Sequence, residues 1–250
     1  MLLKRMQPFT RLLQQTGSFD DLQELCAALQ ETVEDSHVYL ISRRGRVLAY
    51  ALQEGFESTP FDAEWLGTDE APEELQSTVN RVAALSVMEG ENGESILIAP
   101  VVGGDARVAS LLFVADSDIF GEDEQIIAEF ASTAFGMIIS RAIDEKQEDE
   151  AQETRAARSA INSLSYSEVL AMQRIFEELE GDEGLLVASR IADEAGITRS
   201  VIVNALRKLA SANVIESRSL GMKGTYLRIL NKEIRKEFEK QWYPHPRQNN

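Results

Sequence analysis

The stretch from Leu185 to Leu209 constrains the fold most, because it holds two short helical patterns on either side of a glycine turn. Apolar residues recur at helical spacing in Ser189–Glu194 and again, at i, i+4 and i+7, in Thr198–Leu209. Gly196 lies between them and suits the positive φ of a tight turn. The inward-facing positions are Ile191, Ala192, Ile202, Leu206 and Leu209. This pattern predicts a helix-turn-helix.

The second of these helices presents polar residues away from its apolar face. Its three consecutive β-branched residues, Val201–Val203, form helices poorly, so tertiary packing must hold the helix in place. Val203 is difficult to place in the core beside Ile202 and would suit a thymine methyl group. Thr198 is placed to cap the helix. Ser200 in the first turn is a candidate phosphorylation switch, because a phosphate there would repel DNA.

A short β-hairpin is predicted to follow the helix pair. Strands Ile215–Ser219 and Thr225–Leu230 flank Leu220–Gly224, which gives a wing whose Arg218 and Lys223 can contact phosphates. We expect DNA contacts from Ala188, Ser189, Arg190, Thr198, Arg199, Ser200, Val201, Val203, Asn204, Arg207, Lys208, Arg218 and Lys223. The alternative is a signalling or interaction module that uses the helix pair only for protein contacts.

The charge is divided unevenly along the chain. The net charge of −17 is unusual for a protein that binds nucleic acid. Residues 184–250, however, carry 12 Lys and Arg against 6 Asp and Glu, whereas residues 1–183 carry 13 against 36. Such asymmetry indicates a basic nucleic-acid-binding module beside an acidic region. An acidic surface that merely aids solubility would give the same totals.

The first 141 residues show helices at both ends and antiparallel strands between them. Helices are predicted in Met1–Glu34 and Glu122–Arg141, and strands in His37–Ser42, Arg46–Leu52, Arg81–Met88, Ser95–Val102 and Val108–Ala115. Gln53–Asn80 is less regular. This order predicts an α+β sensor domain of the GAF or PAS type.

The charge-dense segment Ala142–Ser159 has neither Gly nor Pro and is predicted to continue the preceding helix as a connector. Asn162–Ser167 interrupts it, Tyr166–Leu179 resumes as a helix, and Glu180–Gly184 is predicted to be a loop. We therefore expect a sensor domain over residues 1–141, a helical linker over 142–165 and a winged helix-turn-helix domain over 166–250.

The sequence offers no set of catalytic residues. It contains one cysteine, Cys26, at a core position of a helix, and two histidines, His37 and His245, without a metal-ligand partner in sequence. We expect neither an enzyme nor a metal site. A single cysteine forms no internal disulfide, no signal peptide is evident, and no run of about 18 apolar residues predicts a membrane helix, so a cytoplasmic protein is expected.

Residues 160–230 closely resemble the CodY family, the pleiotropic transcriptional repressors of low-GC Gram-positive bacteria. The similarity is carried by the runs Ser163–Glu168, Ile175–Leu179, Gly184–Ser189, Gly196–Leu209 and Ser217–Tyr226. Weaker similarity extends to Ser42–Gly45, Pro100–Gly104 and Phe135–Met137.

The resemblance implies a homodimer, or a tetramer, with a GAF domain, a linking helix and a winged helix-turn-helix whose motif spans Ala188–Arg207. It further implies a nutrient-responsive repressor that binds an AT-rich palindrome in double-stranded DNA. Branched-chain amino acids bound to the GAF domain, and in many members GTP, would be the effectors.

The effector site departs from the family pattern. The resemblance assigns pocket-lining positions to Ala83, Leu85, Val87 and Pro100, but Pro60 stands where the family has a carboxylate-binding arginine. No Arg or Lys occurs between Arg46 and Arg81. The segment Gly103–Ser110 lacks the Gly-Lys-Ser/Thr of a phosphate loop and is predicted to be a hairpin turn. We expect an effector that differs from the family's or binds weakly.

Overall fold

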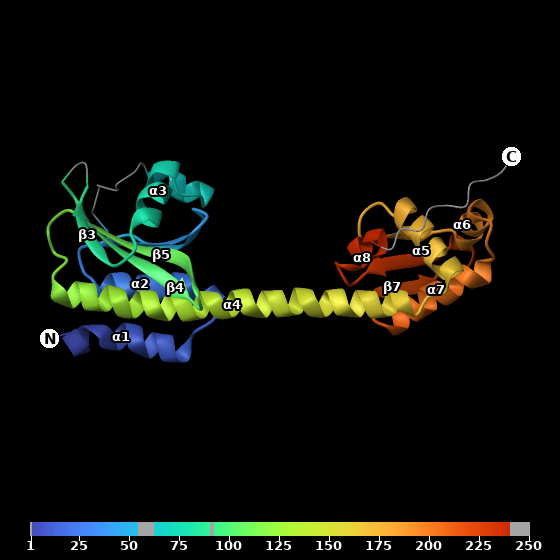
Figure 1. The fold of residues 1–250 in the computed structure, drawn as a ribbon, viewed down its shortest axis with the longest axis horizontal. Coiled ribbons are helices and arrows are strands. Elements are labelled where there is room, and N and C mark those ends of the chain that lie inside the picture. Colours follow the sequence, from blue (N-terminus) through green and yellow to red (C-terminus); the bar gives the residue numbers. More distant parts are fainter. Residues whose placement is uncertain (1, 55–62, 91–92, 241–250) are drawn as a thin grey trace. The chain divides into compact units, whose positions relative to one another are not determined.

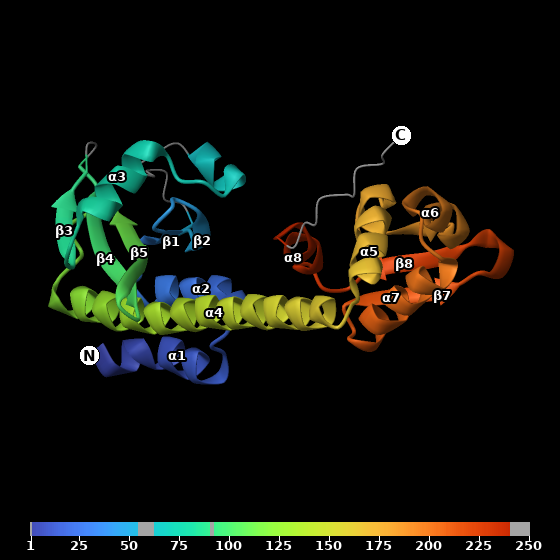
Figure 2. The same cartoon turned by 45° about the vertical axis from the view of Figure 1, so that its right-hand side comes forward.

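The computed structural model describes residues 2–54, 63–90 and 93–240, except for the side chains of residues 63, 64, 67 and 222. The chain divides between Glu145 and Lys146 into two compact units, which are considered separately (Figures 1 and 2). An α+β sensor-like unit comes first and a helix-turn-helix unit with a small sheet follows, which confirms the predicted fold class.

The first unit is a five-stranded antiparallel sheet between two layers of helix, with strand order β2-β1-β5-β4-β3. The strands are β1 (His37–Ser42), β2 (Val47–Ala51), β3 (Ser86–Glu89), β4 (Ser95–Gly103) and β5 (Ala106–Ala115). The helices are α1 (Leu2–Gln15), η1 (Phe19–Asp21), α2 (Leu22–Thr32), η2 (Ala63–Thr68), α3 (Glu73–Arg81) and α4 (Glu122–Asn162). Figure 2 shows α2 and α4 on one face of the sheet and α3 on the other.

Alternation along the strands divides the core between the two faces of the sheet. Leu97 of β4 and Phe113 of β5 are fully buried in one apolar cluster with residues of α1, α2 and α4. Their neighbours Ile98 and Leu112 point the opposite way, toward α3 and η2. Fully buried Tyr39 on β1 belongs to this second cluster. The acidic first half of the chain therefore has an extensive apolar interior.

Two expectations for residues 53–88 were wrong. The segment predicted to be irregular contains η2 and α3, and Arg81, predicted to begin a strand, is the last residue of α3. The strand begins only at Ser86. The helix α3 could not be predicted because only one turn of it is apolar. Its two apolar residues, Leu75 and Val79, bury nearly all their surface against the sheet.

Arg107 on β5 fastens the end of α3 to the sheet. Its guanidinium donates hydrogen bonds to the carbonyl oxygens of Val79 (2.7 Å) and Val82, and to Ser110 Oγ (2.8 Å). Burial and the nearby charge of Arg43 lower the pKa of Arg107. The cation thus lies at a helix C-terminus, where the macrodipole favours positive charge.

The helix α4 is one continuous element of 41 residues, so the predicted extension through Ala142–Ser159 is confirmed. Phe135 and Ile139 of its first half are buried in the sensor core, and Ile161 near its end is buried in the core of the second unit. By length and composition α4 could cross a bilayer, but half of its most apolar window is buried within the protein, as in a core helix.

The second unit packs helices around a three-stranded antiparallel sheet of order β6-β8-β7. Its elements are α5 (Tyr166–Glu178), β6 (Glu183–Leu186), α6 (Ala188–Ala195), α7 (Arg199–Ser211), β7 (Ile215–Ser219), η3 (Gly221–Lys223), β8 (Thr225–Ile229) and α8 (Ile234–Lys240). The predicted loop Glu180–Gly184 is shorter than expected, because Glu183 and Gly184 pair with Arg228 and Leu227 as part of β6.

The C-terminal part of α4 is bound to α8 by a buried carboxylate. Glu237 on α8 accepts hydrogen bonds from Arg158 (2.9 Å) and Lys240 (2.6 Å). These two cations lower the pKa of Glu237 to about 2. Asn231 adds a hydrogen bond from its Nδ2 to the Glu153 carbonyl oxygen (2.8 Å). This end of α4 therefore forms part of the second unit.

Gly136 on α4 is expected to be intolerant of alanine. A Cβ at this position would collide with the backbone oxygen of Val102 on β4, and a Cβ at Gly103 would lie 2.5 Å from the Gly136 oxygen. Overpacking of this kind costs about 2 kcal/mol, so Gly136→Ala should lower the urea midpoint of the sensor unit. The fluorescence of Trp65 in a Trp242→Phe background reports this transition.

The matched control is Thr133→Ala, three residues earlier on an exposed position of the same helix. Alanine is the better helix former, so this change should leave stability within about 0.5 kcal/mol of the parent. Equal midpoints for Gly136→Ala and Thr133→Ala would contradict the close approach of α4 and β4.

Candidate nucleic-acid interface

The helices α6 and α7 form the predicted helix-turn-helix. Gly196 between them adopts φ 64° and ψ 30°, in the left-handed region, and ends α6. The Ile197 N–H then donates to the Ala192 carbonyl oxygen at 2.9 Å. The apolar residues Ile191, Ala192, Ile202, Ala205, Leu206 and Leu209 are buried in one core cluster. The glycine turn and the shared core thus fix the two helices against each other.

The opposite side of α7 is exposed and polar. Arg199, Ser200, Asn204 and Arg207 all lie on the surface. Arg207 donates to Asn204 Oδ1 at 3.2 Å, which aligns two residue types that read base edges. Val203 lies among them with 48% of its surface exposed, as its conflict with the core predicted. The face offers donors, acceptors and one apolar contact.

Thr198 occupies the N-cap position in an extended conformation, but its side chain does not cap the helix as expected. Its hydroxyl instead lies 2.8 Å from the Ser200 hydroxyl. The first turn of α7 therefore has no side-chain cap, and backbone N–H groups at a helix N-terminus bind phosphate well.

Three of the predicted DNA contacts point into the protein. Ala188 is buried in the core of the unit, and Val201 is half-buried against the same core. Lys208 Nζ donates to the Glu168 carboxylate (2.7 Å) and to the Ser163 carbonyl oxygen (3.0 Å). These three residues hold the helices in place, and a prediction from spacing alone could not separate them from the exposed residues.

The remaining cations predicted to contact DNA differ in whether they form ion pairs within the protein. Arg190 pairs with Glu178 at 2.9 Å and Arg218 with Glu216 at 2.6 Å. Arg199 and Lys223 are exposed and form no ion pair among the described residues. The exposed Ser189 lies beside Arg190 on α6. Arg199 and Lys223 are thus the cations most available to a phosphate.

The hairpin β7–β8 confirms the predicted wing. Leu220 N–H donates to the Gly224 carbonyl oxygen at 2.8 Å, and Gly221 and Gly224 have φ of 63° and 107°. A Cβ at Gly224 would lie 2.5 Å from the Leu186 oxygen on β6, so the wing needs glycine there. Lys223 is exposed at the turn.

Glu168 is a positioning residue that the sequence reasoning missed. It is buried on α5, where its carboxylate accepts from Ser165 N–H (2.7 Å) as well as from Lys208. Burial raises the pKa of Glu168, but the hydrogen bonds from Lys208 and Ser165 outweigh it and lower the pKa overall. The spacing Ser165-x-x-Glu168 is that of a capping box and was visible in the sequence.

The four expected effector residues do not share one face of the sensor sheet. Val87 pairs with Leu97 and so faces the helical layer of α2 and α4, and half-buried Leu85 packs against the same cluster. Pro100 pairs with Ser110, in register with the opposite face. Ala83 is exposed before β3 begins. Pro60 lies outside the described residues.

The surroundings of Val87 are acidic. A hollow of about 370 Å³ beside β3 is lined by Val87 together with Glu89, Glu94 and Asp118. The segment Gly103–Ser110 forms the turn and start of the β4–β5 hairpin, as predicted. Within the part of the chain that the structure describes, no cluster of His, Cys, Asp and Glu could hold a metal ion.

Comparison with known proteins identifies the family. A model of the CodY GAF-like domain matches residues 1–163, and a model of the CodY helix-turn-helix domain matches residues 182–241. The global transcriptional regulator CodY of Caldanaerobacter subterraneus subsp. tengcongensis is 42% identical over 252 residues, covering 96% of this chain and 98% of the relative.

The regulators named CodY of Clostridium botulinum and Bacillus pumilus are 39% and 41% identical, each over 254 residues. The first comparison covers 96% of this chain and 98% of the relative, and the second covers 95% and 97%. The chain therefore belongs to the CodY family, whose members are global transcriptional regulators and not enzymes.

Proposed function

We propose that the protein represses nutrient-responsive genes in the cytoplasm by binding an AT-rich palindrome as a homodimer, with α7 in the major groove. The exposed face of Arg199, Val203, Asn204 and Arg207 carries this proposal, because it joins base-edge donors to an apolar contact for thymine. The wing residue Lys223 contacts the phosphate backbone, which orients the protein without reading sequence.

The sensor unit presents an apolar surface suited to the homodimer. Ile126, Phe130 and Met137 on α4 and Leu3 on α1 are exposed to between 39% and 72%. Ile126, Phe130 and Met137 are spaced i, i+4 and i+11 and so share one face of α4, and exposed apolar side chains grouped in this way indicate a protein contact. A two-fold dimer matches the symmetry of a palindromic site.

Arg199→Ala and Asn204→Ala should each weaken binding to an AT-rich palindromic duplex by about 1–3 kcal/mol and reduce discrimination against single-base changes. The loss follows from removing groups that hydrogen-bond base edges. Fluorescence anisotropy with labelled duplexes measures both quantities. Lys236→Ala on α8 is the charge-matched control and should keep the parent affinity. Parent-like affinity and discrimination in both α7 variants would support the interaction-module alternative.

Lys208→Met should destabilise the second unit rather than alter the reading of DNA. It leaves Glu168 buried without its cation, which costs about 3 kcal/mol. The dependence of DNA affinity on salt should be unchanged, whereas Lys223→Met should reduce the slope of log K against log salt by about 1. Thermal unfolding and salt titration measure the two effects.

The double variant Glu168→Gln/Lys208→Met should recover part of the lost stability, because the buried charge is removed. Strictly additive losses in this cycle would contradict the coupling between Glu168 and Lys208. A reduced salt slope in Lys208→Met would show that Lys208 contacts DNA.

We further propose that a small-molecule effector bound to the GAF-like unit controls DNA binding, and that neither isoleucine nor GTP binds tightly. The acidic residues beside Val87 and the absence of Arg and Lys between Arg46 and Arg81 support this, since the carboxylate of isoleucine and the phosphates of GTP each need a cation. Loss of one charge-assisted pair weakens a carboxylate ligand by about 1.5–3 kcal/mol.

Calorimetric titration of the full chain should therefore show weak or no heat of binding for isoleucine and for GTP. Pro60→Arg, which restores the cation that the family resemblance assigns to this position, should bind isoleucine more tightly than the parent. Tight stoichiometric binding of isoleucine by the unmodified chain would contradict the proposal.

A further inference from the structure

Two of the arginines predicted to contact DNA form ion pairs with glutamates in this structure. Arg190 on α6 pairs with Glu178, the last residue of α5, at 2.9 Å. Arg218 on β7 pairs with Glu216 on the same strand at 2.6 Å. The first pair involves the first helix of the helix-turn-helix and the second a strand of the wing, so both lie on elements that accompany α7.

In both pairs the arginine is much more exposed than the glutamate. The side chains of Arg190 and Arg218 are 60% and 72% exposed, whereas those of Glu178 and Glu216 are 26% and 31% exposed. The carboxylates are therefore the more firmly placed partners. A phosphate that approached either guanidinium would meet a cation whose charge is already balanced by a neighbouring carboxylate.

Glu178 depends on Arg190 for its charge balance. The second oxygen of its carboxylate, Oε2, is buried and has no hydrogen-bond partner among the described residues. Arg174, which lines the same surface hollow as Glu178, pairs with Glu177 at 2.9 Å. Moving Arg190 to a phosphate would leave a partly buried carboxylate without a cation, which is unfavourable.

The pair on the wing has an electrostatic effect rather than a structural one. Arg218 and Glu216 are two residues apart on one strand, so their ion pair joins no two elements and adds little stability. Arg228 on β8, opposite Glu216 in register, pairs with Glu183 at 3.7 Å. The arginines on this face of the sheet are thus matched by glutamates, whereas Lys223 has no ion pair among the described residues.

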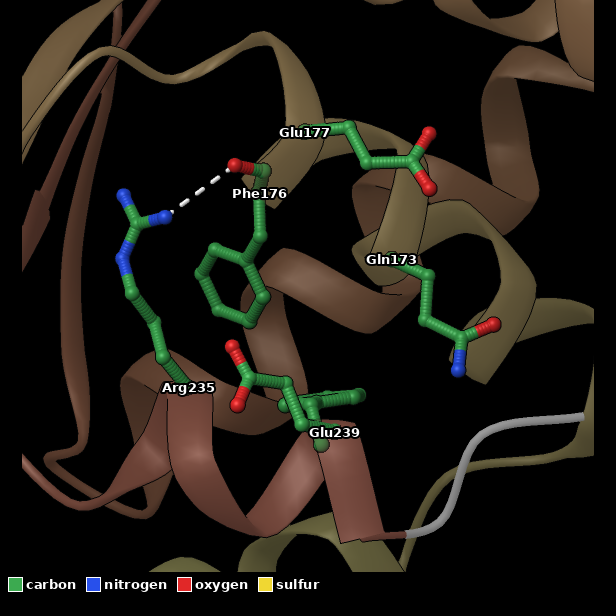
Figure 3. A pocket seen from close by; sticks show the side chains of 6 residues that line it. Gln173, Phe176, Glu177, Arg235 and Glu239 are labelled. Carbon is green, nitrogen blue, oxygen red and sulfur yellow. Dashed lines mark hydrogen bonds between the residues drawn. The ribbon is translucent and has the colours of Figure 1, made fainter.

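Other arginines of the unit anchor the fold. Arg235 on α8 donates hydrogen bonds to the carbonyl oxygens of Phe176 and Leu179 at 3.1 Å, which ties α8 to the end of α5 (Figure 3). Arg190 and Arg218, by contrast, are exposed beside α7. Pairing with a carboxylate there removes positive charge that DNA would otherwise meet.

We propose that Glu178 and Glu216 compete with DNA phosphates for Arg190 and Arg218, and so hold down the sequence-independent affinity of the second unit. The inference rests on the proposed function, because it concerns DNA bound through α7. Phosphate contacts supply affinity for any sequence, whereas base contacts supply discrimination. Binding therefore depends more on the residues of α7 that face the bases and less on the positive charge of the unit.

Glu178→Gln and Glu216→Gln should each raise the affinity of the full chain for a scrambled duplex by about two- to fivefold at low salt, the amount that an exposed ion pair is worth. Each should also steepen the slope of log K against log salt by about 1, because one further phosphate contact forms. The ratio of the affinities for palindromic and scrambled duplexes should not change. Fluorescence anisotropy measures all three quantities.

Glu194→Gln is the matched control. It removes the same charge from an exposed position of α6 that has no ion pair among the described residues. Its affinity and salt slope should stay close to those of the parent, since salt screens an exposed charge that makes no direct contact.

A double-mutant cycle with Arg190→Gln separates the ion pair from a general effect of charge. In the Arg190→Gln background, Glu178→Gln should raise affinity less than in the parent and leave the salt slope unchanged, because no cation is released. An equal gain in both backgrounds, or parent-like affinity of both glutamate variants, would overturn the inference. Failure of the parent to bind either duplex at low salt would refute the proposed function as well.

Discussion

The burial of one face of α7 determines what this regulator presents to DNA. Ile202, Leu206 and Leu209 are buried at i, i+4 and i+7. Burial of this face fixes the rotation of α7 about its axis, so the polar face must point to solvent. The β-branched residues of its first half disfavour a helix in isolation, so the helix depends on this core. Arg199 and Asn204 are exposed as a direct consequence.

Some cations of the second unit stabilise the fold, whereas others are available to bind DNA. Lys208 binds buried Glu168, Arg158 binds buried Glu237, and Arg235 binds the carbonyl end of α5. Arg199 and Lys223, by contrast, have no acidic partner among the described residues. The net positive charge of the unit is therefore a poor measure of its DNA affinity. The position of each cation decides its role.

Short sequence patterns predicted the helices and strands that depend mainly on neighbouring residues. Helical spacing and Gly196 gave the helix-turn-helix, and β-rich runs gave β1, β4, β5 and the wing, because each pattern arises within about a dozen residues. The contacts of Lys208 and the burial of Ala188 could not be predicted, because their partners or neighbours lie far away in sequence: Glu168 is 40 residues from Lys208. The helix α3 was missed for a similar reason, since contacts with the sheet stabilise it.

The unmodified protein is expected to discriminate DNA sequence through the exposed face of α7 despite its net charge of −17. The most direct measurement is its affinity for an AT-rich palindromic duplex and for a scrambled duplex of equal composition, between about 50 and 200 mM salt. We expect both affinities to fall as salt rises while their ratio stays above about 10³. Equal affinity for the two duplexes throughout would contradict it.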